Sequence, residues 1–181
     1  MEIFERTNKG YLYFYKAKEY TEKNSLKKIF LKKYYAKKAI EWYNLAMEEF
    51  QYIREHKMLL SSMIDSLKHY YILDKFEKME TINVLISYFI ICNNANISIN
   101  EHRELIDFFE NNCIPILNKQ KHIVKIGYIY RLIADNLDKF NFIEAIEFYE
   151  KSNYFYNMTK LKYEIQINNY RIKKIENTIK K

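Results

Sequence analysis

The chain between Ala36 and Ile53 places apolar side chains at the spacing of one helix face. The spacing is i, i+3, i+4, i+7, with apolar residues at Ala39, Ile40, Tyr43, Ala46, Met47, Phe50 and Ile53. Charged residues occupy the opposite face, at Lys37, Lys38, Glu41, Glu48, Glu49 and Glu55. This separation predicts an amphipathic helix whose apolar side packs on other helices.

The helical period continues along the rest of the chain. It recurs from Ile123 to Ile133 and from Phe142 to Tyr156. Polar or small residues interrupt it at five places, near Asn24-Ser25, Asp74-Lys75, Cys92 to Ser98, Asn118 and Asn157. The interruptions leave segments of roughly 14 to 25 residues, which is the length of ordinary helices. We expect an all-α stack of about seven or eight antiparallel helices.

Two of these segments match each other position by position. Ala39–Phe50 and Ala145–Tyr156 both read A-I-E-aromatic-Y, followed by a small residue and then by an aromatic one. The offset is 106 residues, and a weaker copy begins at Leu105–Phe109. Because 106 is close to three periods of about 35, we predict a tetratricopeptide-like, right-handed solenoid of antiparallel helical hairpins. The alternative is chance similarity between amphipathic helices of biased composition.

The expected organisation is a single all-α helical-repeat domain over residues 1–181. Its first helix covers 10–24, and an apolar and basic loop covers 25–33. Helical hairpin repeats follow over 34–158, and a basic terminal helix covers 159–181.

The scarcity of glycine and proline excludes several other classes of protein. Two Gly and one Pro leave almost no turn residues for a β-rich fold. Gly10 and Gly127 lie too far apart for a glycine-rich phosphate loop or a GxSxG nucleophile motif. The longest mostly apolar run, Val84–Cys92, is about half the length of a membrane-spanning helix. We therefore expect a soluble helical protein.

The residues also favour an intracellular setting. Glu2 and Glu5 lie where a secretory signal would carry basic residues. Cys92 and Cys113 lack CxxC spacing, so reduced thiols in the cytoplasm are the plainer interpretation.

The net charge of +7 is unevenly distributed. Residues 1–38 carry +7, residues 39–156 carry −5, and residues 157–181 carry +5. A nucleic-acid-binding protein would more often spread Lys and Arg along one face. Few Arg are available to read base edges, and they are Arg6, Arg54, Arg103, Arg131 and Arg171. Nucleic acid is possible as a partner but is not favoured.

The order of these segments resembles the soluble NSF attachment protein (SNAP) family. The closest stretch is Lys121–Tyr130, which reads KHIVKIGYIY, followed after a short linker by Glu144–Tyr156. Ala36–Phe50 is similar to the first repeat helix of the family, and Asn24–Leu31 lies where SNAPs carry an apolar loop. The resemblance covers the N-terminal part of a family member, without the C-terminal helical bundle that contacts the ATPase.

The resemblance implies an adaptor of vesicle fusion and intracellular protein transport that is peripheral on membranes. SNARE bundles are the implied partners, with the N-ethylmaleimide-sensitive factor, an AAA ATPase, as a further one. Lys121 matches a basic position of the family best. Lys125, Arg131, Lys162 and Arg171 are further candidates for a basic face that binds an acidic partner bundle, although a solvated face is the simpler interpretation of these four.

One segment has the composition of a membrane contact. Four apolar residues are flanked by four lysines within eight positions, which suits weak, salt-sensitive binding to an anionic surface. The residues are Leu26, Lys27, Lys28, Ile29, Phe30, Leu31, Lys32 and Lys33. The alternative is that Ile29–Leu31 forms the first turn of the next helix.

No catalytic or metal-binding motif stands out, so we expect no enzyme activity and no cofactor. The four histidines lack the HExxH and ExxH spacings. The acidic pairs Glu48-Glu49 and Glu144-Glu147 lie on polar helix faces. The sequence favours a SNAP-like adaptor, with a generic tetratricopeptide-like scaffold and a basic RNA-binding helical protein as the alternatives.

Overall fold

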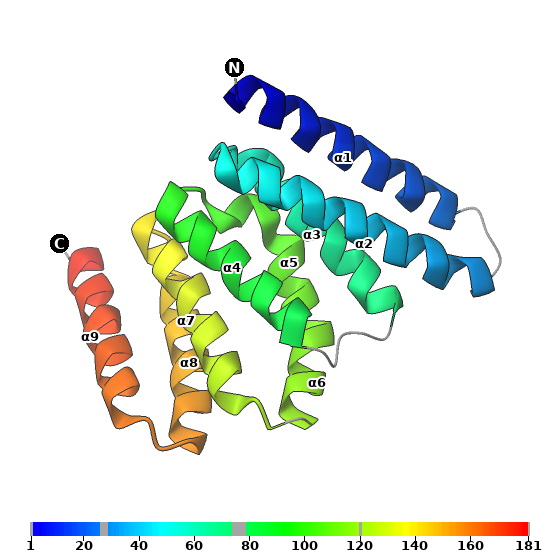
Figure 1. The fold of residues 1–181 in the computed structure, drawn as a ribbon. Coiled ribbons are helices and arrows are strands. Elements are labelled where there is room, and N and C mark those ends of the chain that lie inside the picture. The colour runs from blue at the N-terminus through cyan, green and yellow to red at the C-terminus, as the bar shows by residue number, and fades with distance from the viewer. Residues whose placement is uncertain (1, 26–28, 74–78, 120, 181) are drawn as a thin grey trace. The chain divides into compact units, whose positions relative to one another are not determined.

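The computed structural model describes residues 2–25, 29–73, 79–119 and 121–180 (Figure 1). These residues form helices joined by short turns, and no strand occurs among them, so the all-α prediction is confirmed. The chain divides into two compact units, Met1–Tyr88 and Phe89–Lys181.

The N-terminal unit is built around helix α2. It contains α1 (Glu2–Ser25), α2 (Ile29–Tyr52), α3 (His56–Ile72) and the first part of α4 (Met79–Ala95). Helix α2 packs on both α1 and α3. Small residues at Ala36, Ala39 and Ala46 are fully buried and let the helices approach closely, while Tyr43 and Phe50 fill the space between them.

The C-terminal unit contains the end of α4 and, among the described residues, four further helical runs. The helical run from Ile99 to Lys119 comprises η2 (Ile99–His102), α5 (Arg103–Phe108), the π-helical η3 (Phe109–Cys113) and α6 (Ile114–Lys119). It is followed by α7 (Ile123–Lys139), α8 (Ala145–Met158) and α9 (Lys162–Ile179). Helix α8 packs on both α7 and α9.

The five interruptions expected from the sequence coincide with helix ends. Helices end at Ser25, Ile72, Ala95, Lys119 and Met158. The turn between α2 and α3, at residues 53–55, carries no Gly, Pro or Asn and was not expected. Helix α2 begins at Ile29, so residues 29–33 of the expected loop are helical, while residues 26–28 lie outside the described residues. The first helix begins at Glu2, earlier than the expected residue 10.

The two units share a three-helix element, formed by α1–α3 and by α7–α9. In both, a buried glycine of the first helix meets an aromatic ring of the second. A Cβ atom on Gly10 would lie 2.8 Å from Phe50 Cε1, and one on Gly127 would lie 2.9 Å from Tyr156 Cδ1. The turn after the second helix is also the same, with Glu55 N–H bonded to Phe50 O at 2.9 Å and Leu161 N–H bonded to Tyr156 O at 3.0 Å.

A second sequence match supports this repetition. Gly10–Ala17 and Gly127–Ala134 both read G-Y-[LI]-Y-x-x-x-A. The tyrosine three residues after each glycine packs against an equivalent ring in a tilted arrangement, Tyr13 against Trp42 at 5.5 Å and Tyr130 against Phe148 at 6.1 Å between ring centroids. The offset is 117 residues for the first helices and 106 for the second. The connection between α1 and α2 is therefore the longer one.

The weaker copy within residues 105–117 also has the expected buried pattern. Leu105, Ile106 and Phe109 are buried. The π-helical turn of η3 then adds one residue, so that Cys113 takes the buried position that Ala46 and Ser152 hold in the other copies.

The repeat differs from three helix pairs. Between α2 and α8 the described chain forms four helical runs, which are α3, α4, the run from η2 to α6, and α7. Helix α8 is thus the fifth helical run after its equivalent α2, whereas a repeat of three helix pairs would make it the sixth. The three-helix element is the repeated structure.

Helices in both units end in the same backbone turn although glycine is scarce. A residue one or two positions past the helix has a positive φ, and the next N–H bonds to the carbonyl five residues earlier, as in a Schellman motif. The positive φ values are 59° at Arg54, 56° at Asn96, 60° at Lys121, 62° at Asn141 and 59° at Lys160. Non-glycine residues carry this strain.

We expect Arg54→Gly to stabilise the protein by about 1 kcal/mol, because glycine adopts a positive φ without steric cost. The measurement is chemical denaturation followed by circular dichroism. Lys37→Gly, in the interior of α2, should instead destabilise by about 1 kcal/mol. Equal losses for both variants would contradict the assigned turn geometry.

The N-terminal unit also buries a titratable side chain, that of His69. Its Nε2 lies 2.8 Å from Thr21 Oγ1, which is 3.2 Å from Tyr43 Oη. Its Nδ1 has no hydrogen-bond partner among the described residues. Burial lowers the pKa of His69, Lys18 and Lys68 lower it further, and Asp65 opposes them.

We therefore expect the protein to lose stability as the pH falls below about 6.5, the ordinary pKa of histidine. The unfolded chain then binds a proton that the buried neutral His69 does not, which costs up to about 1.4 kcal/mol per pH unit. Denaturation curves between pH 8 and pH 5 measure the slope. His69→Gln should flatten it relative to the wild type, and an unchanged slope would assign the effect to other groups.

Candidate functional site

The C-terminal unit contains a groove of about 740 Å³ between the end of α4, the side of α7 and the second half of α9. Polar and charged side chains make up most of its wall, with a few apolar ones. The lining residues are Ile90, Asn93, Asn94, Tyr128, Leu132, Asp135, Asp138, Lys139, Asn141, Arg171, Lys174, Ile175 and Thr178.

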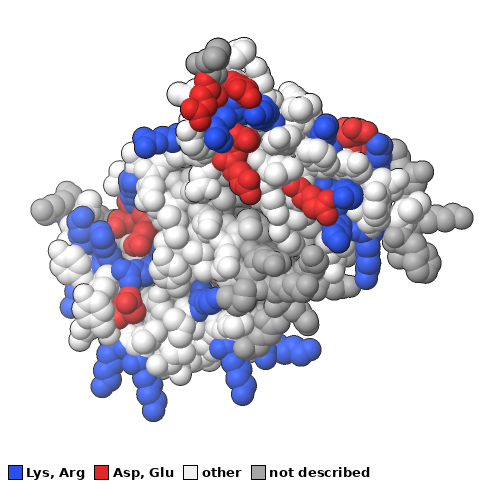
Figure 2. All heavy atoms as spheres, viewed as in Figure 1, with Lys and Arg blue, Asp and Glu red and all other residues white. Residues whose placement is uncertain are grey.

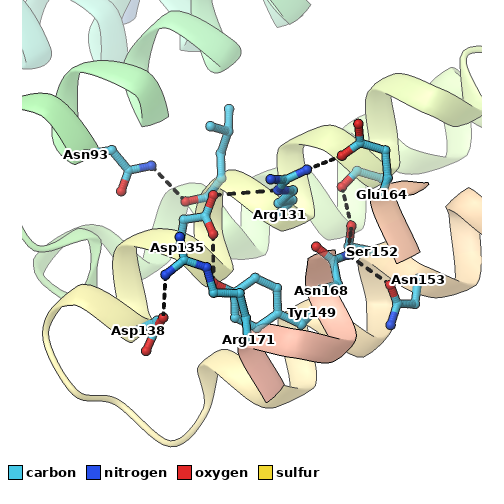
Figure 3. Close-up of polar contacts among 12 residues, drawn as sticks. Asn93, Arg131, Asp135, Asp138, Tyr149, Ser152, Asn153, Glu164, Asn168 and Arg171 are labelled. Carbon is cyan, nitrogen blue, oxygen red and sulfur yellow. Dashed lines mark hydrogen bonds and ion pairs between the residues drawn. The ribbon is translucent and has the colours of Figure 1, made fainter. Parts of the chain in front are cut away.

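Asparagine side chains fix one wall of the groove. The buried Asn136 of α7 donates from Nδ2 to Ile97 O at 3.0 Å and accepts from Ile99 N–H at 2.9 Å. Asn93 of α4 donates to Leu132 O at 3.0 Å, as Figure 3 shows. These bonds join α7 to the end of α4 and to the turn that follows it.

The opposite wall is held by a chain of hydrogen bonds through α8. Ser152 donates to Gly127 O at 2.8 Å. The buried Asn168 of α9 donates to Ser152 Oγ at 3.0 Å and to Asn153 Oδ1 at 2.9 Å. Gly127 makes this possible, because its lack of a side chain lets α8 lie close to α7. The groove is therefore bounded by helices that are fixed to each other.

Opposite charges alternate along the groove and beside it (Figure 3). Arg171 Nη1 lies 3.9 Å from Asp138 Oδ2, and Arg131 Nε lies 3.8 Å from Asp135 Oδ2. Arg131 also forms an ion pair with Glu164. Tyr149 donates to Asp135 Oδ1 at 2.7 Å, and burial raises the pKa of Tyr149. The aspartates are thus neutralised within the protein.

Two polar groups of the groove have no partner among the described residues. Lys174, at the rim, is exposed and makes no ion pair with the described residues. Asn93 Oδ1 is buried and accepts no hydrogen bond from any described residue. A bound segment that offered a carboxylate could pair with Lys174.

The structure separates the five basic residues that the sequence grouped together. Arg171 lines the groove, and Arg131 lies beside it in ion pairs. Lys121 precedes α7, Lys125 lies in its first turn, and Lys162 begins α9, and none of the three lines the groove. Sequence reasoning missed Lys139 and Lys174, although the i, i+3 spacing of Arg171 and Lys174 places them on one helix face.

The expected membrane contact lies only partly within the described residues. Leu26, Lys27 and Lys28 fall outside them. The backbone of Ile29–Leu31 forms the first turn of α2, as the alternative from the sequence had it. Leu31 is 45% exposed, and Lys32 and Lys33 are exposed as well.

The acidic residues and cysteines that could have served in catalysis form ion pairs or are buried. Glu49 pairs with Arg6 at 3.2 Å, Glu144 pairs with Arg103, and Glu147 pairs with Lys151 at 2.7 Å. Cys92 and Cys113 are buried, and burial raises the pKa of the Cys113 thiol. No group of three His, Cys, Asp or Glu side chains that could hold a metal occurs in the described ranges.

Comparisons with known proteins identified no relative of this chain. No protein-family model, curated protein or solved structure matches it. Within the part of the chain that the structure describes, no helix is both long enough and apolar enough to cross a membrane.

Proposed function

We propose that this protein is a non-enzymatic adaptor whose helices pack as in a tetratricopeptide-like, right-handed solenoid. Its partner is an acidic helical bundle, and an assembled SNARE complex is the specific candidate. This assignment rests on the SNAP resemblance together with the all-helical fold. In the same proposal the adaptor links the bundle to an AAA ATPase during vesicle fusion.

The groove of the C-terminal unit carries the proposal. It is lined by α4, α7 and α9, and its aspartates are already paired with arginines. Lys139 and Lys174 therefore leave it with positive charge toward a partner.

The proposed mechanism is geometric. Asn136 and Ser152 hold the helices of the groove in place, so little conformational entropy is lost when a partner binds. Positive charge at the rim speeds the encounter with an acidic surface and makes the affinity depend on salt.

The test compares two double variants of α9 that remove the same charge. Arg171→Gln with Lys174→Gln should weaken binding of a SNARE bundle roughly tenfold at physiological salt. Lys173→Gln with Lys180→Gln, on α9 and at the residue that follows it but outside the groove, should change binding less than twofold. Fluorescence anisotropy with a labelled bundle measures both affinities.

Equal weakening by the two pairs would show that the groove does not hold the partner. Equal affinity for an unrelated acidic helical bundle would keep the adaptor and reject the SNARE as its specific partner. Thermal melts monitored by circular dichroism serve as the control for folding.

A further inference from the structure

Two turns lie together at one end of the C-terminal unit. Helices α7 and α8 run antiparallel, with Ser152 bonded to Gly127 O and Tyr156 packed on Gly127. Residue 123, four before Gly127, is therefore level with Lys160, four after Tyr156. The turn before α7 and the turn between α8 and α9 share this end, as Figure 1 shows.

This end carries a cluster of lysines. Lys119 ends α6, Lys121 and Lys160 lie in the two turns, and Lys162 begins α9. All four are exposed and make no ion pair within the described part of the chain. The acidic residue nearest in sequence to Lys162 is Glu164, which Arg131 already holds. Figure 2 shows lysine and arginine side chains projecting along the lower edge, where this end of the unit lies in Figure 1.

Apolar side chains protrude among these lysines. Met158, the last residue of α8, is 55% exposed, and Tyr163, near the start of α9, is 72% exposed. Val124, near the start of α7, is 46% exposed. Side chains of this kind at helix ends meet water unless a partner covers them.

From these features we infer that the cluster is a docking surface for an anionic membrane. We call it the basic turn surface, formed by Lys119, Lys121, Lys160 and Lys162 with Val124, Met158 and Tyr163. Lipid headgroups offer the negative charge that the lysines require, and the acyl boundary accepts the apolar side chains. Lysine stems reach headgroups while their apolar neighbours insert.

A membrane fits this surface better than RNA does. Phosphates of RNA would pair with the lysines but would leave Met158 and Val124 without an apolar partner. The cluster contains no arginine among its described residues, whereas base edges are most often read by arginine. The surface also consists of helix ends rather than a groove, so a flat bilayer can reach both turns at once.

This inference goes beyond the proposed function and does not depend on it. No residue of the basic turn surface lines the groove, and vesicle binding requires no SNARE bundle. It also differs from the contact that the sequence predicts at Leu26–Lys33, which belongs to the other unit.

The experiment is co-sedimentation of the full chain with vesicles of phosphatidylcholine, either alone or with about one third phosphatidylserine. We expect binding only to the anionic vesicles. The quadruple variant Lys119→Gln, Lys121→Gln, Lys160→Gln and Lys162→Gln should bind at least about a hundredfold more weakly, since each lysine contributes roughly fivefold. Met158→Ser with Tyr163→Ser should also weaken binding while leaving its dependence on salt unchanged.

The matched control removes four exposed lysines elsewhere, at Lys37, Lys57, Lys173 and Lys180. This variant has the same net charge and should lose much less affinity than the first quadruple variant. Equal losses would overturn the inference, because net charge alone would then explain binding. So would binding that persists in the first variant but disappears with Ile29→Ser, Phe30→Ser and Leu31→Ser. Lysine-dependent binding to polyuridine with none to vesicles would replace the membrane by RNA.

Discussion

Replacing Gly127 with leucine should lower the free energy of unfolding by at least about 3 kcal/mol. A Cβ atom at this position would lie 2.9 Å from two ring carbons of Tyr156 and 3.4 Å from Phe155 Cβ. Both aromatic residues are buried, so their rings have no free space into which to move. The clash forces α7 and α8 apart and breaks the bond from Ser152 to Gly127 O.

Urea denaturation measures this effect, and Val124→Leu is the control on the same helix. Because Val124 is exposed, its replacement should change the free energy of unfolding by less than about 0.5 kcal/mol. In Gly127→Leu combined with Tyr156→Ala the two losses should be far from additive, since the smaller side chain makes room for the larger one. A Gly127→Leu protein as stable as the wild type would refute the close packing of α7 on α8.

Replacing Asn136 with leucine should lower the free energy of unfolding by about 2 to 4 kcal/mol. The buried Asn136 is the hydrogen-bond partner of Ile99 N–H and Ile97 O, and leucine leaves both backbone groups without that partner. The substitution also releases the turn after α4 from α7, so the groove should lose affinity for its partner together with stability. Denaturation curves give the first quantity and binding of a labelled bundle gives the second.

Two comparisons separate this effect from a general loss of packing. Asn136→Asp retains an acceptor for Ile99 N–H but cannot donate to Ile97 O when ionised. Its free energy of unfolding should therefore lie between those of the wild type and Asn136→Leu. Asn94→Leu, at an exposed position of the same groove, should be nearly neutral in stability. If Asn136→Leu were also neutral, the assigned pair of hydrogen bonds would be wrong.

The helix positions could be predicted because they follow from local patterns. Apolar side chains at the helical period become the buried faces, as Tyr43 and Tyr149 show at equivalent positions. Helices end where polar residues interrupt that period, near Ser25 and Met158. A second repeat signal, the G-Y-[LI]-Y pattern at Gly10 and Gly127, was present in the sequence and explains the close packing of the first two helices.

Other features depend on geometry that the residue types do not encode. The turn at Arg54 has a positive φ without glycine, because the packing of α2 and α3 compensates for the strain. The π-helical turn shifts the buried face by one residue, and no residue pattern in Phe109–Cys113 predicts this turn. The sequence grouped the five basic residues on one partner-binding face. In the structure two of them, Arg131 and Arg171, form ion pairs with Asp135, Glu164 and Asp138.

Capture of an assembled four-helix SNARE bundle by the full chain tests the adaptor proposal most directly. The pulldown is made at low and at physiological salt, with and without the N-ethylmaleimide-sensitive factor. The account predicts capture at both salt concentrations, stronger at low salt because the rim of the groove is basic. Retention of the ATPase with the bundle would extend the proposal to the whole adaptor function. No capture at either salt concentration would contradict the proposed function.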